Sequence, residues 1–353
     1  MAARSADRGL YFRPVRLLVG DIGGTNTRLA AIEATAAGMV VVRQQTLSSP
    51  KYKTFAQAVL DFGVDPGTAG ACFAIAGPVV DGAVVASNLP WTIHATDLAT
   101  AIGVPRTHLI NDFDAVGHGI TRLGADDVVA LQQGIPVPDG AIALLGPGTG
   151  LGQAMLIRGP AGYRVVPSEG GHVTLAARTE IEWGLVRFLA EKYGGHVSYE
   201  RAISGPGLVD IYHYVVASAI APASATVAEE MKVDIPAAVI TRHAIDNSDP
   251  ACVKATDLFV AIFGSQAGNF ALTALATGGV YLAGGVSPRI LPLLQRSSAF
   301  LKHFADKGRF NHMLSAVPVY VITTDAVGLM GAAAVAAADM SLGGELAVAR
   351  AGR

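Results

Sequence analysis

The chain has 353 residues, of which 51% are hydrophobic and 15% are charged, with a formal net charge of −2. This length predicts two domains, and the apolar content is ample for their cores. The small net charge, with charged residues spread along the chain, does not point to a surface for nucleic acid or for an anionic membrane.

Two cysteines, Cys72 and Cys252, both lie in apolar surroundings and are predicted to be buried free thiols in a reducing compartment. No apolar run reaches the roughly 20 residues that a membrane-spanning helix needs. Residues 1–16 contain four arginines but no apolar signal region, so they are predicted to be an N-terminal extension. A cytoplasmic location is therefore expected.

The first element is a glycine-tipped hairpin. The apolar run 17–19 predicts a buried strand, residues 28–32 predict the returning strand, and between them lies the first glycine loop, Gly20–Asn26. Gly23 and Gly24 are expected to adopt positive φ and to bring backbone N–H groups close to an anion. Asp21 could hold a hydrated cation, while Thr25 adds a neutral donor. The alternative is an ordinary hairpin turn.

The following segments predict an α/β domain with some parallel pairing. Strands are expected at 40–42, 71–76 and 107–110, and helices at 52–62 and from Thr96, which is expected to be an N-cap. Asn111 and Asp112 follow the last of these strands, where ligands bind in open α/β sheets. Helix capping is the alternative for this pair. A helix N-terminus is expected to favour the ionised form of Asp112.

A second hairpin follows a polar segment, 117–140, which is expected to cross between domains. The strands 144–145 and 154–157 flank the second glycine loop, Gly146–Gly152. Two such hairpins in one chain indicate a duplicated fold that holds a phosphate group between its halves. Further on, Glu169 and His172 flank a Gly-Gly turn, and Glu200 lies beside an arginine; side chains of these types in loops usually face solvent.

The remaining segments predict helices at 180–192, 255–275 and 328–338 and strands at 279–283 and 317–322. Trp183 is expected in the core. Gly284 and Gly285 are expected to open directly onto a helix capped by Ser287, with Pro288 as its first residue. Such a turn lets a flat ring lie against bare backbone, although a simple strand-to-helix turn also requires glycine.

The two glycine loops resemble the phosphate-1 and phosphate-2 loops of the hexokinase–actin ATPase superfamily. Within it, residues 17–337 resemble the bacterial glucokinases that lack a zinc motif. The chain has no cysteine cluster of the kind that the related ROK sugar kinases carry. The supporting segments are Ser87–Trp91, Leu109–Phe113, Ser168–His172, Glu200–Leu208 and Tyr281–Gly285.

The resemblance implies a two-domain, actin-like (ribonuclease H-like) α/β fold with duplicated phosphate-binding hairpins and a cleft between the domains. The small domain is expected to comprise residues 17–113 and 324–353, and the large domain residues 114–323. The implied activity is transfer of the ATP γ-phosphoryl group to the 6-hydroxyl of D-glucose. A broader-range hexokinase, a polyphosphate-using glucokinase and a non-catalytic sugar-responsive regulator are the alternatives. A homodimer is expected.

The resemblance also implies roles for individual residues. Asp112 is the expected catalytic base, and Mg²⁺ is expected to bind Asp21 through water. The expected glucose ligands are Asn111, Asp112, Glu169, His172 and Glu200. The expected ATP ligands are Gly20, Asp21, Ile22, Gly23, Gly24, Thr25, Gly148, Thr149, Gly150, Gly284 and Gly285.

Overall fold

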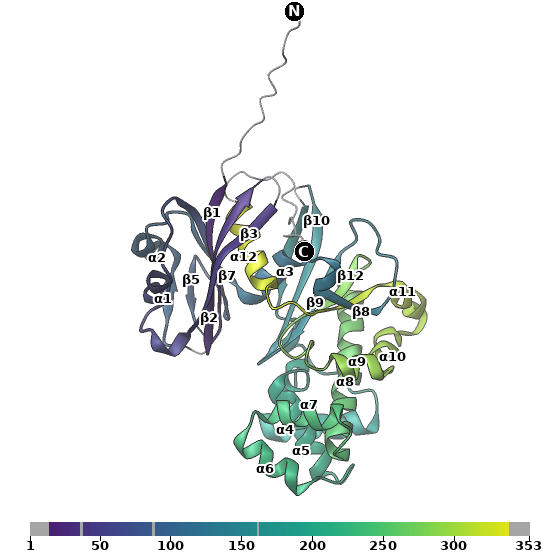
Figure 1. The fold of residues 1–353 in the computed structure, drawn as a ribbon. Coiled ribbons are helices and arrows are strands. Elements are labelled where there is room, and N and C mark those ends of the chain that lie inside the picture. Colours follow the sequence, from purple (N-terminus) through teal and green to yellow (C-terminus); the bar gives the residue numbers. More distant parts are fainter. Residues whose placement is uncertain (1–13, 36–37, 87–88, 161, 339–353) are drawn as a thin grey trace, which may run out of the picture. The chain divides into compact units, whose positions relative to one another are not determined.

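The computed structural model describes residues 14–35, 38–86, 89–160 and 162–338. The N-terminal extension lies almost wholly outside these residues. The chain divides into two compact units, unit 1 from residues 1–122 and 326–353 and unit 2 from residues 123–325 (Figure 1). The first boundary therefore falls after residue 122 rather than after residue 113, because the helix that begins at Asp112 packs within unit 1.

Unit 1 contains a five-stranded sheet with the order β3-β2-β1-β4-β7. The pairs β1–β2 and β2–β3 are antiparallel, whereas β1–β4 and β4–β7 are parallel. The predicted apolar runs all lie in this sheet. A two-stranded sheet of β5 and β6 was not predicted. The strands of unit 1 are β1 (Val15–Ile22), β2 (Asn26–Thr35), β3 (Gly38–Ser48), β4 (Thr68–Ile75), β5 (Ala83–Val85), β6 (Thr92–His94) and β7 (Thr107–Asn111).

Helices cover both faces of the unit 1 sheet. Because side chains alternate along a strand, Leu18 of β1 packs in the cluster that contains residues of α1 and α2, whereas Val19 packs against α12. Helix α2 begins at Ala95 after His94, so Thr96 is not its N-cap as expected. The helices are η1 (Ser49–Lys51), α1 (Phe55–Phe62), α2 (Ala95–Ile102), α3 (Asp112–Ile120) and α12 (Val327–Ala338).

Helices α3 and α12 approach each other backbone to backbone. A Cβ atom on Gly331 would overlap the carbonyl oxygen of Ala115, and a Cβ atom on Gly119 would overlap that of Val327. Only glycine allows so close an approach at these two positions. The helix that carries Asp112 is thereby held firmly against the helix near the C-terminus.

Unit 2 contains a six-stranded sheet with the order β11-β10-β9-β12-β13-β8. Its first five strands repeat the order and the directions of the unit 1 sheet. Strand β8 lies in the segment that was expected only to cross between domains, and it pairs with β13. The strands are β8 (Val128–Gln132), β9 (Ile142–Pro147), β10 (Leu151–Gly159), β11 (Gly162–Ser168), β12 (Gly279–Leu282) and β13 (Val319–Ile322).

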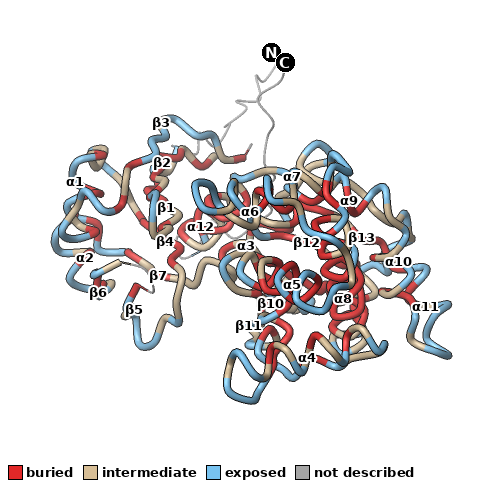
Figure 2. Tube along the Cα trace, turned by 90° about the horizontal axis from the view of Figure 1, so that it is seen from below, coloured by how far each residue is buried: buried red, intermediate tan, exposed pale blue. Residues whose placement is uncertain are grey.

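Several helices of unit 2 pack against α8, which is buried along most of its length (Figure 2). It starts at Pro250, five residues before its predicted start, because Asp249 caps it by accepting a hydrogen bond from the Cys252 N–H. The ring of Phe263 packs edge-on against Phe300 of α10. The α-helices are α4 (Glu180–Tyr193), α5 (Gly205–Ala217), α6 (Ala225–Val233), α7 (Pro236–Ile245), α8 (Pro250–Ala274), α9 (Leu291–Arg296), α10 (Ala299–Ala305) and α11 (Asn311–Ala316). The short 3-10 helices are η2 (Ala125–Asp127), η3 (Gly170–His172), η4 (Tyr199–Arg201) and η5 (Gly308–Phe310).

Two expectations for unit 2 are wrong. Trp183 is 55% exposed, because α4 turns Leu185 and Leu189 toward the core and these lie on another face of the helix. Ser287 does not begin a helix, since α9 starts at Leu291. The intervening segment is tied instead to the end of β9, where the Val286 N–H donates to the carbonyl oxygen of Pro147 at 3.1 Å.

Both cysteines are buried free thiols, as predicted. Within the described ranges, no helix combines the length and the apolar character needed to cross a membrane.

Candidate functional site

The first glycine loop closes the β1–β2 hairpin of unit 1. The Gly23 N–H donates to the Asn26 carbonyl oxygen at 2.9 Å, but neither Gly23 nor Gly24 has the positive φ that was expected. Ser49 supports the loop, because its N–H donates to the Thr25 carbonyl oxygen at 2.9 Å and its Oγ donates to that of Gly23 at 2.8 Å. Ser49 was not predicted, since its contact spans 26 residues of sequence.

Asp21, the second residue of this loop, lies half-buried near the end of β1. A Cβ atom placed on Gly328 of α12 would lie 3.6 Å from its Oδ2, so α12 presents bare backbone beside the carboxylate. Across the part of the chain that the structure describes, no three His, Cys, Asp or Glu side chains form a metal-binding group. One carboxylate beside a glycine loop suits Mg²⁺, which keeps several waters and binds substrate phosphates.

Asn111 caps helix α3. Its Oδ1 accepts hydrogen bonds from the N–H groups of Phe113 at 2.8 Å and Asp114 at 3.2 Å, and its Nδ2 donates to the Gly77 carbonyl oxygen at 3.0 Å. The capping role that was open to either Asn111 or Asp112 therefore falls to Asn111. Its side chain is rigidly held between the end of β7 and the start of α3.

Asp112 is the first residue of α3, and its Oδ1 also accepts from the Phe113 N–H, at 2.9 Å. Burial raises the pKa of its carboxyl group above the usual value for an aspartate, and the hydrogen bonds that it accepts lower the pKa less. The expectation that the helix N-terminus keeps this pKa low is therefore wrong. A carboxylate with a raised pKa is a better proton acceptor.

Three predicted sugar ligands come together in unit 2. The Nε2 of His172 lies 3.8 Å from Oε2 of Glu169, and its Nδ1 lies 3.9 Å from Oε1 of Glu200. The side chain of Glu169 is 88% exposed and that of Glu200 is 24% exposed. Two carboxylates thus flank one imidazole, an arrangement that can accept hydrogen bonds from several hydroxyl groups.

The second glycine loop, between β9 and β10, lies beside this cluster. Within the loop, the Gly148 N–H donates to the Gly150 carbonyl oxygen, and the Gly205 N–H of α5 donates to that of Gly148, both at 2.8 Å. The Leu151 N–H donates to Oε2 of Glu200 at 2.9 Å. The loop is therefore anchored both to the start of α5 and to a predicted sugar ligand.

Gln153 of β10 lies beneath the Gly-Gly turn that carries Glu169 and His172. It is only 3% exposed, and among the described residues neither of its amide atoms has a hydrogen-bond partner. A Cβ atom on Gly170 would overlap its Oε1, so the turn passes directly over this amide.

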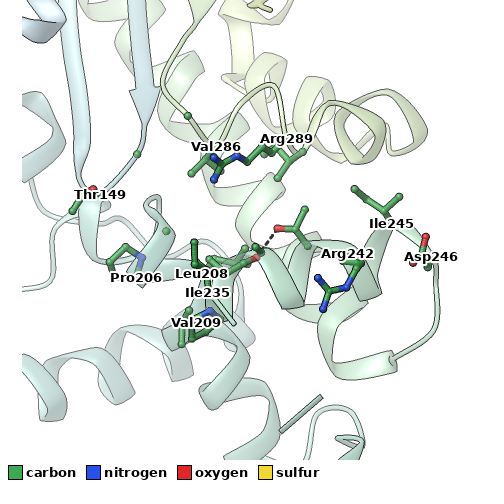
Figure 3. A pocket seen from close by; sticks show the side chains of 18 residues that line it. Thr149, Pro206, Leu208, Val209, Ile235, Arg242, Ile245, Asp246, Val286 and Arg289 are labelled. Atoms are coloured by element: carbon green, nitrogen blue, oxygen red, sulfur yellow. Dashed lines mark hydrogen bonds between the residues drawn. The ribbon is translucent and has the colours of Figure 1, made fainter. Parts of the chain in front are cut away.

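A largely apolar cavity of about 840 Å³ opens beside the second glycine loop, entirely within unit 2 (Figure 3). Thr149 lies at one end and Asp246 at the other. Gly285 also lines the cavity, and Gly284 has φ 74°, where a Cβ atom would overlap the Pro147 carbonyl oxygen. The other residues around the cavity include Pro206, Leu208, Val209, Ile235, Pro236, Ala238, Thr241, Arg242, Ile245, Val286, Arg289 and Ile290.

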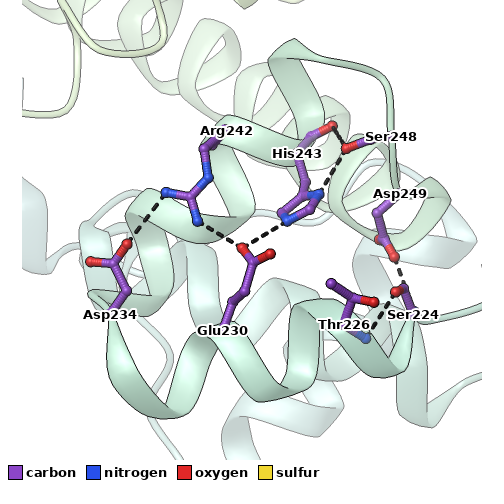
Figure 4. A network of polar contacts seen from close by, with 8 residues as sticks. All are labelled: Ser224, Thr226, Glu230, Asp234, Arg242, His243, Ser248 and Asp249. Atoms are coloured by element: carbon purple, nitrogen blue, oxygen red, sulfur yellow. Dashed lines mark hydrogen bonds and ion pairs between the residues drawn. The ribbon is translucent and has the colours of Figure 1, made fainter.

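The position of Arg242 in the cavity wall is set by a polar network (Figure 4). Its guanidinium donates to Glu230 at 2.7 Å and to Asp234 at 3.3 Å, while His243 contacts the same Glu230 oxygen at 3.0 Å. The sequence analysis did not single out α7, whose residues contribute to the cavity wall. No motif in its sequence marks that position.

The predicted residues thus fall into two sets. Asp21, the first glycine loop, Asn111 and Asp112 belong to unit 1, whereas Glu169, His172, Glu200, the second glycine loop and Gly284–Gly285 belong to unit 2.

Comparisons with known proteins agree with one another. Residues 18–339 match the family model described as glucokinase. The glucokinase of Nostoc punctiforme is 40% identical over 338 residues, which cover 91% of this chain and 98% of that protein. The crystal structure of a glucokinase from an Antarctic psychrotroph is similar with a TM-score of 0.80 and 32% identity, and covers 92% of this chain and 99% of that one. The glucokinase of Balamuthia mandrillaris in complex with glucose has a similar fold, with a TM-score of 0.75 and 23% identity over 93% of this chain and 95% of that one.

Proposed function

The chain belongs to the glucokinase family, and from this premise we propose how its residues transfer the γ-phosphoryl group of ATP to the 6-hydroxyl of D-glucose. The chemistry asks the protein mainly to position the two substrates and to stabilise charge.

Glu169, His172 and Glu200 bind hydroxyl groups of glucose, together with Asn111 and Asp112. The observation that carries this assignment is the cluster in unit 2, where His172 lies within 4 Å of both carboxylates. An ionised oxygen accepts from hydroxyl groups in charge-assisted hydrogen bonds, which are about twice as strong as neutral ones. Such a cluster has no purpose in a filament-forming or chaperone ATPase with similar phosphate loops.

The cavity in unit 2 receives the adenosine of ATP. Its apolar walls suit a purine, and Thr149 at one end belongs to the second glycine loop. Both glycine loops bind phosphate oxygens. The residues are Gly148, Thr149 and Gly150 of the second glycine loop and Gly20, Ile22, Gly23, Gly24 and Thr25 of the first glycine loop. A charged polyphosphate chain would gain no binding energy from an apolar cavity. The presence of the cavity therefore favours a nucleotide as the phosphoryl donor.

Asp21 would hold Mg²⁺ through water. When bound, the ion neutralises negative charge on the phosphate oxygens. The backbone of Gly328 lies beside this carboxylate, and a Cβ atom there would be 3.6 Å from Oδ2.

Asp112 accepts the proton of the 6-hydroxyl group as the hydroxyl oxygen bonds to the γ-phosphorus and the bond from this phosphorus to the leaving ADP breaks. Its burial, which raises the pKa of the carboxyl group, makes it better suited to this role than an exposed aspartate. Asn111 fixes the start of α3 and therefore the position of the Asp112 backbone.

A coupled assay of the purified chain over a panel of hexoses, with ATP or polyphosphate as donor, tests this function. We expect turnover with glucose and ATP. Equal turnover of several hexoses would indicate a broader hexokinase, turnover with polyphosphate would contradict the role of the cavity, and no turnover would favour a regulator.

We also propose a homodimer in the cytoplasm. Val40, Val41 and Val42 of the edge strand β3 are each at least 50% exposed, which offers apolar surface that a second copy would cover. Buried free thiols at Cys72 and Cys252 suit a reducing compartment. Light scattering of the purified chain measures the oligomeric state.

A further inference from the structure

The two carboxylate oxygens of Glu200 face two different parts of unit 2. Oε1 lies 3.9 Å from His172 in the proposed sugar site, while Oε2 accepts a hydrogen bond from the Leu151 N–H at 2.9 Å. Leu151 immediately follows Gly150 of the second glycine loop. One side chain therefore contacts both the proposed sugar site and the proposed phosphate-binding loop.

Gly150 packs directly against the same carboxylate. A Cβ atom at Gly150 would overlap Oε2 of Glu200, so only glycine leaves room for the carboxylate in its present place. By contrast, a Cβ atom at Gly148, two residues earlier in the loop, would meet no atom within 4 Å. Within this loop, the Glu200 carboxylate therefore packs against Gly150 but not against Gly148.

The backbone around Glu200 is itself fixed. The hydroxyl of Ser204 donates to the Glu200 carbonyl oxygen at 2.8 Å, and its Oγ accepts the Gly207 N–H at 3.0 Å, which caps α5. The next residue, Gly205, donates to the Gly148 carbonyl oxygen at 2.8 Å. The segment 200–205 thus holds the second glycine loop at two points, one through a side chain and one through the backbone.

We propose that Glu200 is a positioning residue that couples the binding of the sugar to the binding of the nucleotide. A sugar hydroxyl that bonds to Oε1 restricts rotation of the carboxylate, which strengthens the hold of Oε2 on the Leu151 N–H. The loop is then fixed in the form that receives phosphate. The inference rests on the proposed function, in which Glu200 binds glucose and the second glycine loop binds ATP.

Coupling between two sites is reciprocal, so the nucleotide must tighten glucose binding by the same factor as glucose tightens nucleotide binding. Such factors are typically about 5- to 150-fold. If Glu200 only stabilised the fold, substitutions that displace its carboxylate would leave this coupling factor unchanged.

Calorimetric titration of glucose into the purified full chain, with and without saturating AMPPNP and Mg²⁺, measures the coupling factor. In the unmodified chain we expect the dissociation constant of glucose to fall at least about fivefold when the nucleotide is present. In Gly150→Ala, where the added methyl group displaces Oε2, we expect the factor to fall toward one. The same variant should bind glucose more weakly even without nucleotide.

Gly159→Ala, at the far end of β10 and outside the proposed site, is the matched control, because its methyl group would lie no closer than 3.6 Å to a neighbouring atom. Its affinity for glucose without nucleotide should equal that of the unmodified chain. If Gly150→Ala does not fold, Glu200→Asp replaces it, since the shorter side chain keeps its charge but withdraws from Leu151. A Gly150→Ala or Glu200→Asp chain with the unmodified coupling factor would overturn the proposal.

Glu200→Gln separates the proposal from its premise. If this variant binds glucose as tightly as the unmodified chain, Glu200 is not a sugar ligand and the proposed site is wrong. If it binds glucose weakly while Gly150→Ala retains full coupling, the sugar site stands and the coupling alone is refuted.

Discussion

The Oδ1 atom of Asn111 lies 2.8 Å from the backbone nitrogen of Phe113 and caps helix α3, although Asp112 is the residue proposed to accept the proton. Asp112 also contacts the Phe113 N–H, at 2.9 Å, but it stands inside the helix as its first residue. The capping and catalytic roles are therefore assigned to different side chains. A substitution at Asp112 can test catalysis while the Asn111 cap remains.

Asp112→Asn should lower kcat by about 10²- to 10⁴-fold, the usual contribution of a positioned acid–base group. The amide keeps the size of the side chain and an oxygen for the Phe113 N–H, but it cannot take the proton. Steady-state kinetics and circular dichroism measure activity and folding. Asp97→Asn, in the first turn of α2, is the control for loss of a helix N-terminal charge. A folded Asp112→Asn chain with near-normal kcat would refute the assignment of Asp112 as the catalytic base.

The pH dependence should report the same carboxyl group. Because burial raises the pKa of Asp112, kcat/KM should fall as the pH drops through a value above that of an ordinary aspartate. This acid limb should be absent from the residual activity of Asp112→Asn. If the acid limb of the kcat/KM profile stayed at the same pH in Asp112→Asn, another group would be responsible for it.

The sign of the stability effect follows from the same shift. A carboxyl group whose pKa is higher in the folded than in the unfolded chain destabilises the fold above the unfolded pKa, and this cost disappears as the pH falls below both values. Asp112→Asn should therefore raise the melting temperature at neutral pH more than at acid pH. Calorimetric scans across that pH range measure the difference.

Glu169→Gln should raise the KM for glucose about ten- to hundredfold, because a hydrogen bond to a charged group contributes about 1.5–3 kcal/mol. The KM for ATP should hardly change. Glu180→Gln, an exposed carboxylate at the start of α4, is the matched control. An unaltered KM for glucose would remove Glu169 from the sugar site.

Ala238→Trp should fill the cavity proposed for adenosine and raise the KM for ATP more than about tenfold, a loss of 1.4 kcal/mol in binding. Glucose binding in the absence of nucleotide should be unchanged, which calorimetric titration measures. Ala228→Trp on α6 adds the same side chain at an exposed position outside the cavity. Equal effects of both variants on ATP would contradict the assignment.

Gln153→Met should stabilise the fold by about 1–3 kcal/mol, the cost of leaving buried polar groups without partners. Gln132 is the matched control, because its Nε2 donates to the carbonyl oxygens of Leu314 at 2.8 Å and Val317 at 2.6 Å. Gln132→Met should destabilise the fold. Urea unfolding of both variants measures the change in the free energy of unfolding. If both variants were destabilised, the Gln153 amide would have hydrogen-bond partners in solution.

Sequence patterns predicted the buried strands and α8 because continuous apolar runs have few other stable arrangements. The runs at 17–19, 71–76 and 144–145 all lie in central strands. Strand β8 was missed because all five of its residues are only half-buried at a sheet edge, and its sequence carries a weaker signal.

The candidate site was predictable where its residues cluster in short motifs, as with Glu169 and His172. Of the cavity proposed for adenosine, the sequence analysis anticipated the glycine turns but not the rest of the wall, because α7, α5 and the segment after β12 contribute to it from separate parts of the chain. At Ser287 the sequence predicted a feature that the structure does not have, the start of a helix. A local helix-start pattern was overridden by the hydrogen bond between Val286 and Pro147, which no local pattern encodes.

The packing of α12 against β1, β4 and α3 has a consequence for how the chain folds during its synthesis. Leu329, Ala333 and Ala336 of α12 share a core with Leu17 and Val19, residues made more than 300 positions earlier. Unit 2 is continuous from Leu123 to Asp325, so the ribosome completes it first. Until α12 emerges, the part of the unit 1 sheet that it covers stays exposed, and β1, the strand that carries Asp21, cannot complete its packing on that face.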